Sequence, residues 1–256
     1  MLHQQPGAVA QPQSKLILQQ ARTQSEIAEA QALRYRVFIE EMGASIASKV
    51  EGIDRDMFDP YCDHLIVRDS ASFDVVGTYR ILPPAQAHRI GGFYADEEFD
   101  LTRLANLRHE LVELGRSCVH PDYRNGATIA LLWNGIAQYL QANNYRYLIG
   151  CASVSLSDGG AGAAAVYHQV REKHLGPIEW RVFPRCPLPA EMVDTDPGGQ
   201  GSERRSLPPL IKGYLRAGAH VCGDPAWDAD FNTADLFMLL PIAHLNQRHA
   251  ARFMGG

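Results

Sequence analysis

The sequence predicts a single α+β domain, in which strand patterns and amphipathic helix patterns follow one another along the chain. A branched apolar run at residues 111–119 is followed, after a turn that contains Pro and Gly, by apolar residues at helical spacing over 129–140. Two short strand patterns at 64–68 and 75–82 are joined by a polar turn, which indicates a β-hairpin. A hydrophobic share of 46% in 256 residues is enough for a substantial core.

Composition excludes several classes of protein. A net charge of −5 argues against a general nucleic-acid binder. No run of 18 apolar residues exists, and the N-terminus lacks the pattern of a secretory signal. The five cysteines are scattered without a C-x-x-C pair, so we expect neither a metal site nor a disulfide framework, and reduced thiols indicate a cytoplasmic protein.

The remaining elements follow in order. Residues 1–14 are rich in Gln and Pro and are expected to be a disordered tail. After a short strand at 15–21, Thr23 and Glu26 form a capping box that opens a helix, which Gly43 can end. Further patterns predict helical pieces at 97–107, a strand at 145–152, helices at 159–176 and 210–217, and strands at 178–183 and 235–242. Residues 184–207 are rich in Pro and Gly and are expected to form a mobile loop inside one domain that spans 15–256.

The strand and helix around residues 110–144 carry two chemical signals. A strand that leads into a helix through a Gly-containing turn leaves free backbone N–H groups at the start of the helix, which suit a phosphate. Glu113 and Arg116 lie inside the predicted strand. A buried strand has little reason to carry two charges unless they pair or take part in chemistry.

The order of these elements resembles the GNAT acyltransferase fold, which implies a mixed, mainly antiparallel sheet flanked by helices. An ordered set of motifs is similar to the acyl-homoserine-lactone synthases and, more closely, to the L-ornithine Nα-acyltransferases. The motifs are Leu33-Arg34-x-x-Val37-Phe38, Asp63-His64-Leu65-Ile66-Val67, Val76-Gly77-Thr78-Tyr79-Arg80-Ile81-Leu82-Pro83, Glu113-Leu114-Gly115-Arg116-Ser117-Cys118-Val119 and Phe231-Asn232-Thr233-Ala234-Asp235. The resemblance implies an enzyme that moves a 3-hydroxyacyl chain from acyl carrier protein to the α-amine of ornithine, giving lyso-ornithine lipid.

The predicted donor site departs from the wider GNAT pattern. The usual acyl-CoA loop is R/Q-x-x-G-x-G/A, and here the segment that begins at Arg124 lacks the second glycine. Acyl carrier protein presents a phosphopantetheine arm with one phosphate and no pyrophosphate, so this loop is compatible with a carrier-protein donor and no other cofactor. The resemblance assigns donor binding to Ser117, Cys118, Val119, Arg124, Gly126, Ala127 and Trp133.

Attack of an amine on a thioester needs a proton acceptor and donors for the oxyanion. Glu113 is the candidate base, directly or through water, and the alternative is a structural acid in a salt bridge. Arg116 is the second candidate catalytic residue; strict alternation puts it on the opposite face, but a bulge at Gly115 would realign the two. The alternative for Arg116 is a partner that only neutralises Glu113. Backbone N–H groups of the strand are the expected oxyanion donors.

The acceptor site follows from the two charges of ornithine. By resemblance, Arg34 and Arg80 are candidates for its carboxylate, which favours a bidentate arginine. Asp56, Asp59 and Asp63 are available for its distal amine, although any single one of these acids is more typical of a solvated loop.

Two aromatic residues and one basic cluster complete the predictions. Phe38 and Trp133 are candidates for an acyl tunnel, but their helical spacing is also typical of ordinary core. Acyl carrier protein is acidic, so a docking patch should be basic, and the best cluster is Arg204, Arg205, Lys212 and Arg216. The amphiphilic product is compatible with peripheral association at the inner membrane.

Other readings remain open at this level. The same fold could make another N-acyl amino acid or an acyl-homoserine lactone, could use a CoA donor, or could be a non-catalytic acyl-carrier or lipid-binding module. The H-x4-D spacing of His64 and Asp69 suggests an O-acyltransferase, but five residues along a strand place these side chains on opposite faces. Cys118 and Cys151 lie in apolar strands, where a free thiol is usually inert packing.

Overall fold

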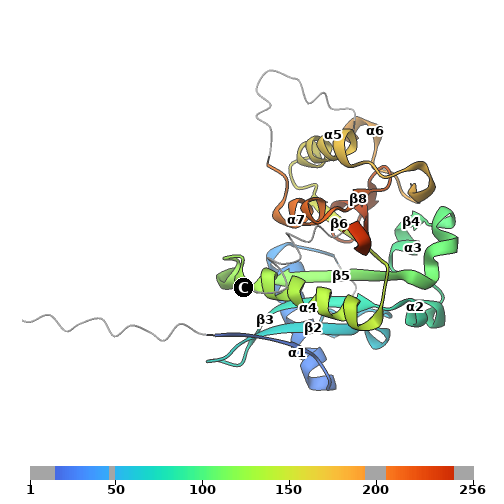
Figure 1. Ribbon diagram of the computed structural model, residues 1–256. Helices are drawn as coiled ribbons and strands as arrows, with labels where there is room; N and C mark the ends of the chain where they lie inside the picture. The colour runs from blue at the N-terminus through green and yellow to red at the C-terminus, as the bar shows by residue number, and fades with distance from the viewer. Residues whose placement is uncertain (1–14, 46–49, 194–205, 245–256) are drawn as a thin grey trace, which may run out of the picture.

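The structure is a computed structural model that describes residues 15–45, 50–193 and 206–244 (Figure 1). The predicted tail at 1–14, and residues 194–205 of the predicted loop, lie outside the described residues. None of the described helices is long and apolar enough to cross a membrane.

One large sheet organises the molecule. Its strands, in spatial order, are β1 (Leu16–Gln20), β2 (Asp63–Asp69), β3 (Val75–Leu82), β5 (Leu111–Val119), β6 (Tyr147–Ser155), β10 (Thr233–Pro241) and β8 (His220–Val221), and β9 (Ala226–Asp228) also pairs with β10. Every neighbouring pair is antiparallel except β5 and β6, which are parallel. The predicted mixed, mainly antiparallel sheet is confirmed.

Helix α1 (Gln24–Tyr35) begins as predicted. The Thr23 hydroxyl accepts from the Glu26 N–H, and the Glu26 carboxylate accepts from the Thr23 N–H, so the capping box is complete. The helix continues as a π-helical segment, Arg36–Glu41, and the chain then turns at Gly43, where φ is +74°.

The other α-helices are α2 (Pro84–Ile90), α3 (Ala95–Glu98), α4 (Ala127–Asn143), α5 (Ala161–His174), α6 (Ala190–Val193) and α7 (Pro209–Ala217). The predicted strand at 178–183 is wrong: Pro177 precedes a 3₁₀ turn, Ile178–Trp180, and only β7 (Phe183–Pro184) is extended, paired with β4 (Phe99–Asp100). Ile178 is 70% exposed, so this apolar residue does not mark a core strand.

Alternating side chains on β2 place helices on both faces of the sheet. Ile66 packs in a cluster with α1, whereas Leu65 and Val67 pack in another cluster with α4. On β3, a Cβ added to Gly77 would lie 2.4 Å from the Thr128 methyl group, so this glycine permits close approach of α4. Figure 1 shows α5, α6 and α7 on the side of β6 and β8, away from α1.

The sheet opens between β5 and β6. The two strands pair only where residues 111–113 face 147–149, and neither pairs with the other beyond that point. Strand β5 also contains a bulge, because Thr78 faces Cys118 while Arg80 faces Gly115, which leaves one extra residue on β5. Pairing on only one edge exposes backbone and side chains of β5 in the opening.

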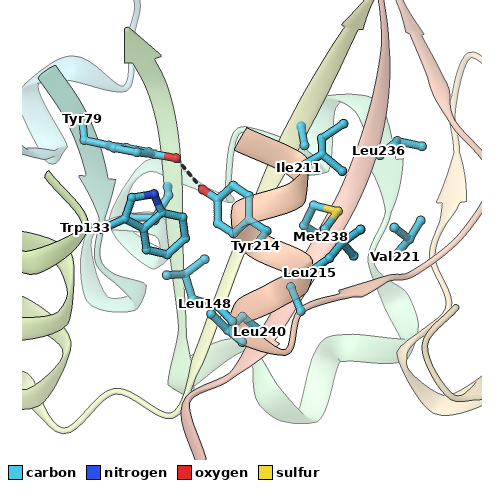
Figure 2. Packing of buried hydrophobic residues seen from close by; sticks show 14 of the residues in the cluster. Tyr79, Trp133, Leu148, Ile211, Tyr214, Leu215, Val221, Leu236, Met238 and Leu240 are labelled. Carbon is cyan, nitrogen blue, oxygen red and sulfur yellow. Dashed lines mark hydrogen bonds between the residues drawn. The ribbon is translucent and has the colours of Figure 1, made fainter. Parts of the chain in front are cut away.

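Helix α7 covers this opening from one face. Figure 2 shows Tyr214 projecting from α7 toward Tyr79 on β3, and their hydroxyl groups share a hydrogen bond. The ring of Trp133, on α4, packs edge-to-face against the Tyr214 ring with centroids 4.8 Å apart. These contacts tie the two halves of the sheet together on the side opposite α1.

Candidate active site

A cavity of about 510 Å³ lies where β5 and β6 separate. Its wall includes residues 113–119 of β5, side chains of β3, β6 and β10, and the first turn of α7. Strand β5 contributes more residues to this wall than the other strands do, and its edge that does not pair with β6 faces the cavity. A site of this size accommodates a small polar substrate together with part of an acyl chain.

Glu113 lies in the cavity wall and is only 4% exposed. One carboxylate oxygen accepts from the Tyr94 N–H at 2.7 Å and the other from the Ala95 N–H at 2.8 Å. Burial outweighs these hydrogen bonds and raises the pKa of Glu113 to about 7. A carboxyl group with this pKa can accept a proton near neutral pH.

Arg116 occupies the bulge of β5, with φ at +51°. The bulge brings Arg116 and Glu113 to the same cavity, as expected, although Arg116 rather than Gly115 takes the left-handed conformation. The Arg116 Nη2 lies 3.3 Å from Asp56, and the guanidinium lies 5.0 Å and 4.8 Å from the rings of Tyr94 and Phe231. Arg116 therefore does not serve as the neutralising partner of Glu113.

Arg34 is fully buried and bound to two aspartates. Its Nε lies 2.8 Å from Asp54, and its two terminal nitrogens bind the Asp59 carboxylate at 2.8 and 2.9 Å. The structure therefore places Arg34 behind the cavity, where it holds the 54–59 segment, and not in the cavity wall. Asp59 is likewise engaged, and the adjacent Arg34 guanidinium keeps the pKa of Asp59 well below its usual range despite burial.

Arg80 does line the cavity. Its Nη1 lies 2.6 Å from both oxygens of Asp56, which stands between Arg80 and Arg116. Together with Arg34, these arginines face Asp54, Asp56 and Asp59, so three cations are balanced by three anions. We call these six residues the arginine–aspartate network.

The structure separates Asp63 and Trp133 from the cavity wall. Asp63 accepts from the Gln20 amide at 2.8 Å and from the Tyr139 hydroxyl at 2.6 Å, on the side of the sheet that α4 covers. Trp133 belongs to the core beneath α7. Phe38 does line the cavity, and its ring packs edge-to-face on Phe231.

The predicted donor residues divide into two groups. Ser117, Cys118, Val119 and Arg124 line the cavity, and Arg124 is fixed by an ion pair with Glu41 at 2.6 Å. Burial raises the pKa of the Cys118 thiol to about 12, which makes it a poor nucleophile.

Gly126 and Ala127 form the start of α4. Gly126 has φ at +95°, a conformation that favours glycine, and the Ala127 N–H donates to the Asn125 side chain at 3.1 Å. Of the predicted docking cluster, Lys212 and Arg216 are exposed on α7, whereas Arg204 and Arg205 lie outside the described residues.

Sequence reasoning missed a group of acids at the β10 side of the cavity. Asp235, which is 3% exposed, and Asp228 line the cavity, and Glu98 on α3 lies beside them. Burial is the main cause that raises the pKa of both Glu98 and Asp235 above the usual range, and repulsion from Asp228 adds to it at each. Ligand atoms of Glu98, Cys151 and Asp235 lie within 4.8 Å of one another, a spacing that suits a cation. The motif that ends at Asp235 signalled this place, but nothing in the sequence links it to Glu98.

Known proteins place this geometry in context. A family model described as an acetyltransferase (GNAT) domain matches residues 33–134. The chain is 37% identical over 249 residues to the L-ornithine N(alpha)-acyltransferase of Brucella abortus (strain 2308), covering 91% of this chain and 86% of that protein. It is 38% identical to the enzyme of the same name from Rhizobium meliloti (strain 1021), covering 95% and 84% of the two chains. Among solved structures, the N-acyl amino acid synthase FeeM from uncultured soil microbes matches with a TM-score of 0.55 at 12% identity, covering 90% and 92% of the two chains, and supports the same fold.

Proposed function

This chain belongs to the L-ornithine N(alpha)-acyltransferase family, and on that premise we propose that it transfers a 3-hydroxyacyl chain from acyl carrier protein to the α-amine of L-ornithine. The chain is an acyltransferase with a GNAT fold. The observation that best supports the proposed reaction is Glu113, a buried carboxyl with a pKa of about 7, in the wall of a cavity where two strands separate. The product is lyso-ornithine lipid.

Glu113 accepts the proton of the attacking amine, directly or through one water molecule. The amine nitrogen forms a bond to the thioester carbonyl carbon, and the tetrahedral intermediate then expels the phosphopantetheine thiolate. Residues 114, 115, 118 and 119 have a strand partner on β3, and none of residues 114–119 pairs with β6, so backbone N–H groups at this edge are suited to the oxyanion. No covalent enzyme intermediate is needed, and the neutral thiol of Cys118 agrees with direct transfer.

Arg80 and Arg116 are the cations of the arginine–aspartate network that line the cavity, and we assign the ornithine carboxylate to them. Arg34 supports this site indirectly, because it fixes Asp59, which in turn lies 3.4 Å from Arg80. The apolar part of the wall, which includes Phe38, Phe231 and Leu210, is available for the acyl chain.

The carrier-protein donor is supported by the start of α4. A single glycine, Gly126, precedes that helix where an acyl-CoA enzyme usually has two. The phosphopantetheine arm carries one phosphate, which one helix N-terminus can bind. Exposed Lys212 and Arg216 on α7 are suited to an acidic carrier protein. We place the reaction in the cytoplasm, with the amphiphilic product favouring peripheral contact with the inner membrane.

The test is a product assay with purified protein. The protein is incubated with 3-hydroxyacyl-carrier protein and a panel of amino acids and homoserine-type acceptors, and the products are identified by mass spectrometry. Acyl-ornithine should dominate, and parallel reactions with 3-hydroxyacyl-CoA should be much slower. If another amine is acylated and no acyl-ornithine forms, ornithine is not the acceptor. If the CoA thioester reacts as fast as the acyl carrier protein thioester, the carrier-protein assignment is wrong.

A further inference from the structure

Three carboxyl groups from three separate elements meet at the β10 side of the cavity. Glu98 comes from α3, Asp228 from β9 and Asp235 from β10, where it faces Ser153 of β6. We call them the acidic triad. Asp228, Asp235 and Ser153 line the cavity itself, and burial by the same strands raises the pKa of each of Glu98 and Asp235.

The acidic triad has no positive partner within the described part of the chain. No arginine, lysine or histidine of residues 15–45, 50–193 and 206–244 forms an ion pair with any of its three carboxylates. Both carboxyl oxygens of Glu98 are buried, and the polar groups around them among these residues are the Tyr94 hydroxyl, the Cys151 thiol and the Asp235 carboxyl, none of which is a cation. The arginine–aspartate network differs in this respect, because Asp54, Asp56 and Asp59 each lie against a guanidinium.

Buried carboxyl groups without a countercharge are unfavourable, so a cation that enters the cavity is bound preferentially at this place. An ammonium group has three N–H donors and no acceptor, which matches the carboxyl oxygens that Glu98, Asp228 and Asp235 offer as acceptors. We propose that the acidic triad binds the distal ammonium of the acceptor and makes the cavity selective for a diamino acid. This proposal rests on the proposed function and assigns the recognition that Asp56, Asp59 and Asp63 were expected to provide.

The position of the triad relative to Glu113 supports the assignment. The Cys151 thiol has Glu98, Asp235 and Glu113 all in its electrostatic surroundings, and together with burial they keep its pKa well above its usual range. The candidate base, Asp228 and Asp235 therefore lie in the wall of the same cavity as this cysteine of β6. An acceptor whose distal ammonium reaches the triad has its α-amine on the side of Glu113, with Arg80 and Arg116 near its carboxylate.

A divalent metal ion is the competing occupant, because Glu98, Cys151 and Asp235 have the spacing of a metal site. The two occupants differ in what they displace, because a metal ion would bind the Cys151 thiolate and release its proton, whereas an ammonium group would bind carboxyl oxygens alone. The ammonium is favoured by the reaction proposed for this cavity, whose acceptor carries a distal amine, and metal analysis distinguishes the two occupants.

The test compares L-ornithine with L-norvaline, which has the same carbon skeleton and α-amino acid group but no distal amine. The values of kcat/KM for both acceptors are measured with the wild-type protein and with Asp235→Asn, Glu98→Gln and Asp228→Asn. The preference for ornithine over norvaline should fall about 30-fold or more in Asp235→Asn, because truncating one member of a buried charge pair removes this much affinity. A general loss of folding lowers both values together and leaves the ratio unchanged.

Glu172→Gln on α5 is the matched control, since it removes one exposed carboxylate outside the cavity and should keep the wild-type ratio. An unchanged ratio in all three triad variants that keep the wild-type kcat/KM for norvaline, while the wild type still makes acyl-ornithine, would overturn this inference and leave the proposed function intact. Failure of the wild type to acylate ornithine would instead contradict the proposed function. Analysis of the metal content of the purified protein tests the competing occupant. A stoichiometric divalent metal in the wild type that is absent from Asp235→Asn would show that the triad binds a metal ion and would overturn the ammonium assignment.

Discussion

Replacing Glu113 with glutamine tests the assignment of the base most directly. The amide has nearly the same shape as the carboxylate but cannot accept the proton of the attacking amine. Loss of a positioned general base lowers kcat by about 100- to 10,000-fold. The wild-type rate should rise with pH through an apparent pKa near 7, the value to which burial raises the pKa of Glu113, and Glu113→Gln should lose this rise.

The same substitution has a calculable effect on stability. The folded protein holds the Glu113 proton more tightly than the unfolded chain does, because its pKa is about 7 in place of 4.5. The free energy of unfolding therefore decreases as pH rises from about 4.5 to about 7, by a total of about 3 kcal/mol. Glutamine removes this pH dependence, but its NH₂ group must face the N–H of Tyr94 or Ala95, which costs about 1–3 kcal/mol at every pH.

Two measurements follow. Rates of acyl-ornithine formation are recorded between pH 5.5 and 9 for the wild type and for Glu113→Gln. The titration of the substrate amine affects both pH–rate profiles equally, so the difference between the two profiles reports Glu113. The free energy of unfolding is measured with denaturant at pH 5 and pH 8. Its difference between the two pH values should be smaller for Glu113→Gln than for the wild type. Glu110→Gln is the control, because Glu110 lies outside the cavity and pairs with Arg146 at 3.0 Å. The reasoning is refuted if Glu113→Gln keeps more than a tenth of wild-type kcat, or keeps the rise near pH 7.

Three further substitutions test the surroundings of the site. Arg34→Lys loses the bidentate contact with Asp59 and should lower the free energy of unfolding by about 3–5 kcal/mol in urea, and an unchanged midpoint would show that the buried contact is dispensable. Gly150→Ala places a Cβ 2.6 Å from the Leu114 carbonyl oxygen, so we expect a loss of at least about 1–3 kcal/mol, measured by the same method, and wild-type stability would mean that β5 and β6 can separate freely there. Asp56→Asn leaves the charge of Arg80 less balanced, which should lower the pKa of Glu113 and move the rise of the pH–rate profile to lower pH; an unmoved profile would contradict this electrostatic coupling.

Local features of the fold were predictable because short segments determine them. The capping box at Thr23 and Glu26 involves four consecutive residues, and the structure forms it as expected. The hairpin of β2 and β3 is also a local pairing. The 178–183 segment was misread because a short apolar run has no length or period to distinguish a strand from a turn after proline.

The site was predictable in its residue types but not in its partners. Arg34 was predicted by resemblance to bind the substrate carboxylate, yet its partners Asp54 and Asp59 lie 20 and 25 positions along the chain, and no sequence pattern shows that they occupy its guanidinium group. The acidic triad joins Glu98 to Asp235 through tertiary packing alone. The guanidinium of Arg116 likewise contacts Asp56 and two aromatic rings, all from segments distant in the sequence.

The division of charge in this cavity explains how one buried carboxyl can remain a base. Arg80 lowers the pKa of Glu113, and an unbalanced guanidinium so close would keep that carboxyl ionised and weakly basic. Asp56 lies against Arg80 and offsets its charge, so burial decides the outcome and the pKa rises to about 7. The arginines can then bind a substrate carboxylate as members of a neutral network, without removing the basicity of Glu113. No ion pair reaches the acidic triad from residues 15–45, 50–193 and 206–244, and a diamino acid brings a positive charge with it.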